Sequence, residues 1–139
     1  MNEIIPDVWI TSYSVYKKKP MLNCYHINTK EDLEILGNNS EYKEDIKKSL
    51  IKYQIIKLYK YISEKITIIH NELMKQKVII ITCKNGNVIS PLVCVCYIIK
   101  YGGLDVETAI KCVTSKRSDI IIDDLFFKNI ANKIYNDSL

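Results

Sequence analysis

The sequence predicts an α/β fold in which helices flank a central, mostly parallel sheet. VWITSY at 8–13 and CYHIN at 24–28 alternate and are rich in β-branched and aromatic residues, which is typical of strands. The run VIII at 78–81 is continuous, apolar and β-branched, as in a strand buried on both faces. Helical spacings dominate the rest of the chain after this run. Strands followed by helices around one buried central strand indicate an α/β domain.

Length and charge favour one domain that binds neither nucleic acid nor a membrane. With 139 residues and 47% apolar content, the chain can form one hydrophobic core, so residues 1–139 are interpreted as a single domain. The net charge of +4 is mild, and the lysines alternate with acidic residues instead of forming a stripe. The apolar run 88–99 is too short to span a bilayer, which takes about 20 residues.

The cysteines predict a reducing environment. Their number is odd and no C-x-x-C pair occurs, so we expect neither a disulfide framework nor a structural zinc site. The five are Cys24, Cys83, Cys94, Cys96 and Cys112. We therefore expect an intracellular, cytoplasmic protein without a metal or another cofactor. Cys94 and Cys96 fall in an apolar helix and are interpreted as core residues.

The segment before VIII has two interpretations. Apolar residues at helical spacing predict a helix from about Tyr59 to Lys75: Leu58, Ile62, Ile66, Ile69 and Leu73. KYQII at 52–56 is interpreted as a strand ahead of this helix. However, Ile46 and Leu50 continue the helical spacing backwards, so one long helix from Asp45 stays open.

Three helices are predicted after the central strand. Ser90 and Pro91 open a buried helix to about Tyr101, which Gly102 and Gly103 end. Two more helices carry apolar residues at helical spacing. Asp105 caps the first, with Ala109, Ile110 and Val113, and Asp123 or Asp124 caps the second, with Phe127, Ile130 and Ile134.

The loop after VIII has the form of an anion-binding site. A strand, a short loop with Gly86 and a helix N-terminus direct backbone N–H groups and a helix dipole toward one point. Cys83 ends the strand, and the same field would lower the pKa of its thiol. Taken alone, a small apolar residue at a strand end is the simpler interpretation of this cysteine.

The wider pattern resembles the dual-specificity branch of the cysteine-dependent protein tyrosine phosphatases. That family's signature is His-Cys, two residues, Gly, two residues, Arg, then Ser or Thr. The same register here reads Thr82, Cys83, Gly86, Ile89 and Ser90 around the intervening residues. Three further segments are similar to the family, namely IIPDVWITSY, SPLVCVCYIIKYGGLDVETAIKCV and RSDIIIDDLFFKNI. The similarity is weakest from Glu31 to Leu50.

The resemblance implies a catalytic apparatus that this chain has lost in part. In the family, the cysteine attacks phosphorus, the arginine holds the phosphoryl oxygens, the serine assists the second step, and an aspartate protonates the leaving oxygen. Here Ile89 replaces the arginine and Thr82 the histidine. The only arginine, Arg117, matches a structural position. Where the family carries its aspartate, between a strand and the helix before the cysteine, this chain has only Lys57 and Leu58.

These losses predict a pseudophosphatase, that is, a phosphatase fold kept as a protein-binding or scaffolding module. A weakly active cysteine-dependent phosphatase and a phosphoprotein reader stay open as alternatives. The candidate anion-binding loop is Lys84, Asn85, Gly86, Asn87, Val88, Ile89 and Ser90. We expect a protein partner, and a homodimer is open.

Two sets of side chains outside the loop receive simpler interpretations. His26 and His70 are 44 residues apart and nothing links either to Cys83, so both are interpreted as structural histidines rather than catalytic ones. Tyr13, Tyr16 and Tyr25 are considered as one exposed cluster that could belong to a partner surface.

Overall fold

The structure is a computed structural model of the 139-residue chain. It describes residues 1–18, 24–29, 44–83, 89–118, 120 and 127–139, and the backbone alone for 44–51.

A four-stranded sheet forms the centre of the fold, in the order β1-β2-β4-β3. Its strands are β1 (Asn2–Ile5), β2 (Val8–Ser12), β3 (Cys24–Asn28) and β4 (Val78–Cys83). β4 pairs in parallel with both β2 and β3, and β1 pairs antiparallel with β2. The predicted α/β fold with a mostly parallel sheet is therefore confirmed, and VIII lies in a central strand.

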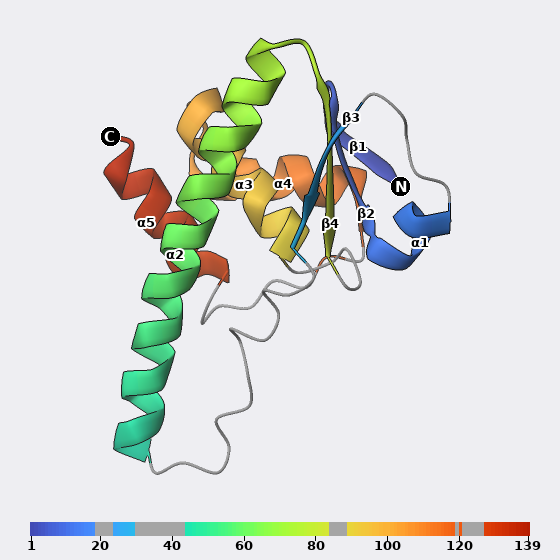
Figure 1. Ribbon diagram of the computed structural model, residues 1–139. Helices are drawn as coiled ribbons and strands as arrows, with labels where there is room; N and C mark the ends of the chain where they lie inside the picture. The colour runs from blue at the N-terminus through green and yellow to red at the C-terminus, as the bar shows by residue number, and fades with distance from the viewer. Residues whose placement is uncertain (19–23, 30–43, 84–88, 119, 121–126) are drawn as a thin grey trace.

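Helices cover both faces of this sheet unequally (Figure 1). They are α1 (Tyr13–Lys18), α2 (Glu44–Met74), α3 (Ile89–Gly102), α4 (Val106–Lys116) and α5 (Asn129–Asp137). α2, α3 and α5 lie on one side and the short α1 on the other (Figure 1). α3 is central to the helical layer, since it contacts α2, α4, α5 and β4.

The strand interpretation of Lys52–Ile56 is wrong, and the alternative of one long helix is correct. α2 runs from Glu44 to Met74 and includes this segment. Leu58, Ile62, Ile66 and Ile69 form its buried face, and the partly buried Ile55 extends that face by one turn. Packing at a spacing of three and four residues thus outweighs the β-propensity of the run.

The predicted features of the later helices are confirmed where the structure describes them, with one exception. Ser90 does not cap α3, because Ile89 precedes it within the helix and the Ser90 Oγ has no hydrogen-bond partner among the described residues. α3 is buried along almost its whole length, and Gly103, with φ of +70°, follows its end in the left-handed region that favours glycine. Asp105 caps α4, because its Oδ1 accepts a hydrogen bond from the Thr108 N–H at 2.8 Å.

The apolar residues predicted for these last two helices are buried: Ala109, Ile110, Val113, Phe127, Ile130 and Ile134. Asp123 and Asp124, expected to cap the last helix, lie outside the described residues.

The sequence interpretation missed β1 and α1. β1 has only four residues, and it turns into β2 through Pro6 and Asp7. The Asp7 N–H donates to the Glu3 carboxylate at 3.2 Å, which stabilises this turn. A proline–aspartate turn signal between two short β-rich runs could have indicated the hairpin.

No helix in the described ranges is both long and apolar enough to cross a membrane.

Alanine substitutions at Ile56 and Leu58 test the helical register of α2. A strand that ran on from 52–56 through Leu58 would place both side chains on one face, but in α2 Leu58 is fully buried and Ile56 is 57% exposed. Leu58→Ala should lower the free energy of unfolding by about 2–5 kcal/mol. Ile56→Ala should change it by less than about 0.5 kcal/mol. Urea unfolding measures both, and similar losses for the two variants would contradict the helix.

Candidate functional site

Cys83 ends the central strand β4. Its Cα is opposite Ser12 of the parallel strand β2, and its side chain is only 1% exposed and belongs to the main hydrophobic core. Side chains alternate along a strand, so Cys83 shares its face with Ile79 and Ile81 and faces the helical layer. The cysteine is thus at the expected carboxyl edge of the sheet, but it is covered.

The residue after the loop is buried as well. Ile89 begins α3, has an exposed fraction of 0%, and belongs to the same core as Cys83. Ser90 is equally buried, and its Oγ has no hydrogen-bond partner in the part of the chain that the structure describes. Lys84, Asn85, Gly86, Asn87 and Val88 lie outside the described residues.

The start of α3 retains some capacity to attract an anion. The first N–H groups of a helix lack carbonyl partners within the helix, and the macrodipole adds partial positive charge there. The buried Ser90 hydroxyl adds a polar group at the same helix end. Neither β4 nor the first turn of α3 contains a lysine or an arginine. The polarity available from these residues is therefore dipolar, without a formal charge.

Thr82, directly before the cysteine, joins a network on the other face of β4. Its Oγ1 lies 2.8 Å from the Nε2 of His26 on β3 and 3.5 Å from the Oδ1 of Asn28. Its carbonyl accepts hydrogen bonds from the N–H and the hydroxyl of Thr29, at 2.7 and 2.6 Å. These bonds fix the end of β4 against β3.

His26 is therefore one strand away from the cysteine strand, which its sequence position did not indicate. Its ring stacks on Tyr16 with centroids 4.0 Å apart, and Tyr13 lies further out at 6.3 Å. Burial lowers the pKa of His26 and favours the neutral imidazole. The contacts support the structural interpretation of this histidine, although the link to Thr82 was missed.

The expected cluster of three tyrosines does not form. Tyr13 and Tyr16 approach His26 on one side of β3, whereas Tyr25 packs against the main core. Neighbouring residues of a strand point to opposite faces, which separates Tyr25 from the other two.

Arg117, the only arginine of the chain, has a structural contact far along the sequence from the loop. It caps the end of α4, and its Nη1 donates to the Asn2 Oδ1 of β1 at 2.8 Å. The contact joins the helical layer to the edge of the sheet, in agreement with the structural interpretation.

The place expected for a general acid lies within a continuous helix. Lys57 and Leu58 are in the middle of α2, where Lys57 is exposed and Leu58 is fully buried. Between Glu44 and Met74 the helix leaves no room for a loop that could carry an acid. Residues 30–43 lie outside the described part of the chain.

The other candidate residues have structural surroundings. His70 stacks on Tyr101 at 4.1 Å between ring centroids. Cys94 and Cys96 are buried in α3, as expected, and burial raises the pKa of both thiols. Among the described residues, no three or more His, Cys, Asp or Glu side chains gather in a way that could hold a metal ion.

A cysteine ending a central parallel strand, followed by a loop and a buried helix, defines a phosphatase-type α/β domain. Residues 8–134 match the family described as dual specificity phosphatase, catalytic domain, and the chain belongs to this family. No curated protein is similar enough in sequence to add to this comparison.

Solved structures share the fold at low sequence identity. The human tyrosine phosphatase-like serine/threonine/tyrosine-interacting protein is 16% identical with a TM-score of 0.69, over 96% of this chain and 94% of that one. Human DUSP28 is 13% identical with a TM-score of 0.66, over 99% and 96% of the two chains. A leucine-rich repeat and phosphatase domain protein from Entamoeba histolytica is 15% identical with a TM-score of 0.67, over 98% and 90%.

The His26 contacts predict a loss of stability in mild acid. The pKa of His26 is lowered in the folded state, so the unfolded state binds more protons just below its ordinary pKa of about 6.5. The free energy of unfolding should therefore be at its full value above about pH 6.5 and should fall as the pH drops toward 5. Urea unfolding across this range measures the effect.

His26→Gln should remove this pH dependence, whereas the control His70→Gln should keep it. A wild-type stability that is flat between pH 7 and 5, or that His26→Gln leaves unchanged in slope, would contradict the assignment.

Proposed function

We propose that this protein is a catalytically inactive, phosphatase-like domain that acts as a protein-binding or scaffolding module. The observation that carries the proposal is the burial of Ile89. This residue stands where the family signature has its phosphate-binding arginine, and it has no exposed surface. An aliphatic side chain packed in the core cannot supply the bidentate charge that an arginine gives to phosphoryl oxygens.

The continuity of α2 supports the same proposal. Removing one preorganised charge-stabilising group slows an enzyme about 10²–10³-fold, and losing a general acid slows it about 10²–10⁴-fold. Such losses do not multiply fully, yet the reaction rate would still be lower by roughly 10³-fold or more. The burial of Cys83 would add a barrier to substrate access.

A structural relative makes the role plausible. The human protein that shares this fold is described by its name as tyrosine phosphatase-like and as serine/threonine/tyrosine-interacting. At 16% identity this similarity concerns the fold. A binding role for the present chain therefore depends on its own residues.

Hydrolysis of an aryl phosphate tests the inactivity. Turnover by the wild-type chain should equal that of Cys83→Ser, because neither the Ile89 position nor α2 supplies the missing groups. Stopped or continuous assays of released phenol measure both proteins, with an active dual-specificity phosphatase as the positive control. Turnover that depends on Cys83 and approaches that of the active enzyme would sink the proposal and favour a working phosphatase.

A phosphoprotein reader is the second candidate, supported by Ser90. A buried hydroxyl without a described partner at a helix N-terminus has the polarity of an anion site. Against this role, a phosphate reader usually employs an arginine, and the only arginine of this chain contacts Asn2.

Calorimetric titration distinguishes the reader from a phosphate-independent module. A reader should bind phosphate, sulfate and a phosphopeptide, and Ser90→Ala should weaken each by about tenfold or more by removing a donor to a charged ligand. The unphosphorylated peptide is the matched control. We expect no phosphate-dependent binding, and a phosphopeptide that binds through Ser90 would replace the scaffold proposal with the reader.

A further inference from the structure

The N-terminal part of α2 extends away from the rest of the domain (Figure 1). Before Ile55, no described residue of this helix belongs to the core or packs against it. Tyr53 is 58% exposed and Ile56 is 57% exposed, although both are large apolar or aromatic residues. Exposed apolar side chains on a projecting helix indicate a binding surface rather than a solvated face.

Two rows of side chains lie along α2 from Tyr53 to Thr67. One row is Tyr53, Lys57, Lys60 and Glu64, and the other is Ile56, Tyr59, Ser63 and Thr67. Each row follows a spacing of three or four residues, so its members lie above one another on the helix. The first row lies on the side of α2 away from the buried Leu58 and Ile62, and the second row borders the core, since Tyr59 is partly buried against it. We call this surface the α2 groove, and it spans ~21 Å at 1.5 Å per residue.

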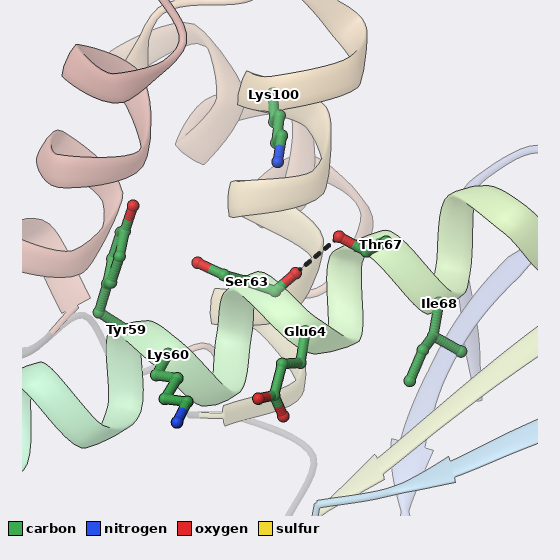
Figure 2. Close-up of a pocket in the computed structure, with 7 residues that line it drawn as sticks. All are labelled: Tyr59, Lys60, Ser63, Glu64, Thr67, Ile68 and Lys100. Carbon is green, nitrogen blue, oxygen red and sulfur yellow. Dashed lines mark hydrogen bonds between the residues drawn. The ribbon is translucent and has the colours of Figure 1, made fainter.

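The C-terminal half of the groove contains a hollow of about 760 Å³. Figure 2 shows Tyr59, Ser63 and Thr67 on the side nearer to Lys100 of α3, and Lys60 and Glu64 on the other side of the same helix face. The Thr67 hydroxyl donates a hydrogen bond to the Ser63 carbonyl oxygen at 2.9 Å. A space between two such rows is the shape that receives a ridge of another helix.

The charge of the groove selects the kind of partner. Exposed Lys52, Lys57, Lys60 and Lys100 outnumber the carboxylates of Glu64 and of Asp137, which accepts a hydrogen bond from the Tyr59 hydroxyl. The Lys57 Nζ lies 5.2 Å from the centre of the Tyr53 ring, so positive charge extends to the aromatic end. A second copy would bring lysines against lysines in a chain of net charge +4, which disfavours self-association here.

We propose that the α2 groove docks an acidic amphipathic helix of a partner protein. Apolar side chains of that helix contact Tyr53 and Ile56, and its aspartates and glutamates face Lys57 and Lys60, in the helix-in-groove mode of recognition. The inference rests on the proposed role as a binding module and assigns that role to a surface away from the Cys83 loop.

A stapled, fluorescent peptide tests the charge of this surface. It is a helix of about four turns, ~15 residues, with leucines at i, i+3 and i+4 and glutamates beside them. Anisotropy should show that the full chain binds it and that Lys57→Glu with Lys60→Glu weakens binding by at least about tenfold. Lys111→Glu with Lys116→Glu, at two exposed lysines on α4, is the charge-matched control and should have little effect.

A second pair of variants tests the apolar contacts. Tyr53→Ala with Ile56→Ala should also weaken binding by about tenfold or more, without loss of folding, because both side chains are exposed. Met74→Ala, which alters a 73% exposed apolar residue at the other end of α2, is the matched control.

Four outcomes would overturn the inference. They are no binding of the peptide, equal binding of a scrambled peptide, binding to anionic vesicles alone, and sedimentation of the chain as a dimer that Tyr53→Asp dissociates. The aryl phosphate assay reads the Cys83 loop independently. Failure of the peptide to bind the α2 groove is therefore distinguishable from phosphatase activity that contradicts the proposed inactivity.

Discussion

The burial of α3 is the constraint on which the rest of the structure depends. The helix is apolar almost all round, so it is stable only when other elements cover every side of it. β4, α2, α4 and α5 provide that cover. Because burial begins with Ile89, the first residue of the helix is also part of the hydrophobic core. The Ile89 side chain therefore both completes the hydrophobic core and occupies the signature position of the phosphate-binding arginine.

The same packing is compatible with the proposed loss of phosphatase chemistry from a chain that keeps the family fold. The family fold has a central strand and a buried helix after it, and this chain keeps both in a match over residues 8–134. Phosphate transfer requires in addition a cation at the helix entry and an acid beside it. Ile89 packs in the core at the position of that cation. The segment expected to carry the acid is part of the continuous helix α2. Fold and function are thus separable here.

Because Cys83 and Ile89 are buried, exposed features elsewhere are the natural place for the proposed recognition. Among the described side chains of α2, residues 52–74, the fully buried ones begin at Leu58. The preceding turns are stable as a continuation of the helix, and they present Tyr53 and Ile56 to solvent. Under the two proposals, the continuity of α2 accounts for the missing acid and presents the surface that binds a partner.

The sequence predicted the central elements because their signals are strong. The buried run in β4, the Asp105 cap and the helical spacing of Ile130 and Ile134 each have one straightforward structural interpretation. Lys52–Ile56 does not, because a short run of β-branched and aromatic residues fits a strand or a helix until its packing partners are known. β1 was too short to stand out.

The candidate site was predictable in its residue types and not in their surroundings. The register alone identified Cys83, Ile89 and Ser90, and it showed that Ile89 stands in the arginine position. It could not show that Ile89 packs in the core. Nor could it show that His26 hydrogen-bonds Thr82, which is 56 residues further along the chain, on the neighbouring strand. Both facts depend on tertiary contacts between distant segments, for which the local pattern carries no signal.

The stability and activity of Ile89→Arg test the central claim most directly. Because position 89 is fully buried, an arginine there would place an unpaired charge in the core and should lower the free energy of unfolding by about 3 kcal/mol or more. Ile89→Leu, a volume-conserving control, should cost less than about 1.5 kcal/mol. The account predicts a destabilised variant without turnover of an aryl phosphate. An Ile89→Arg protein with wild-type stability and turnover that depends on Cys83 would contradict it.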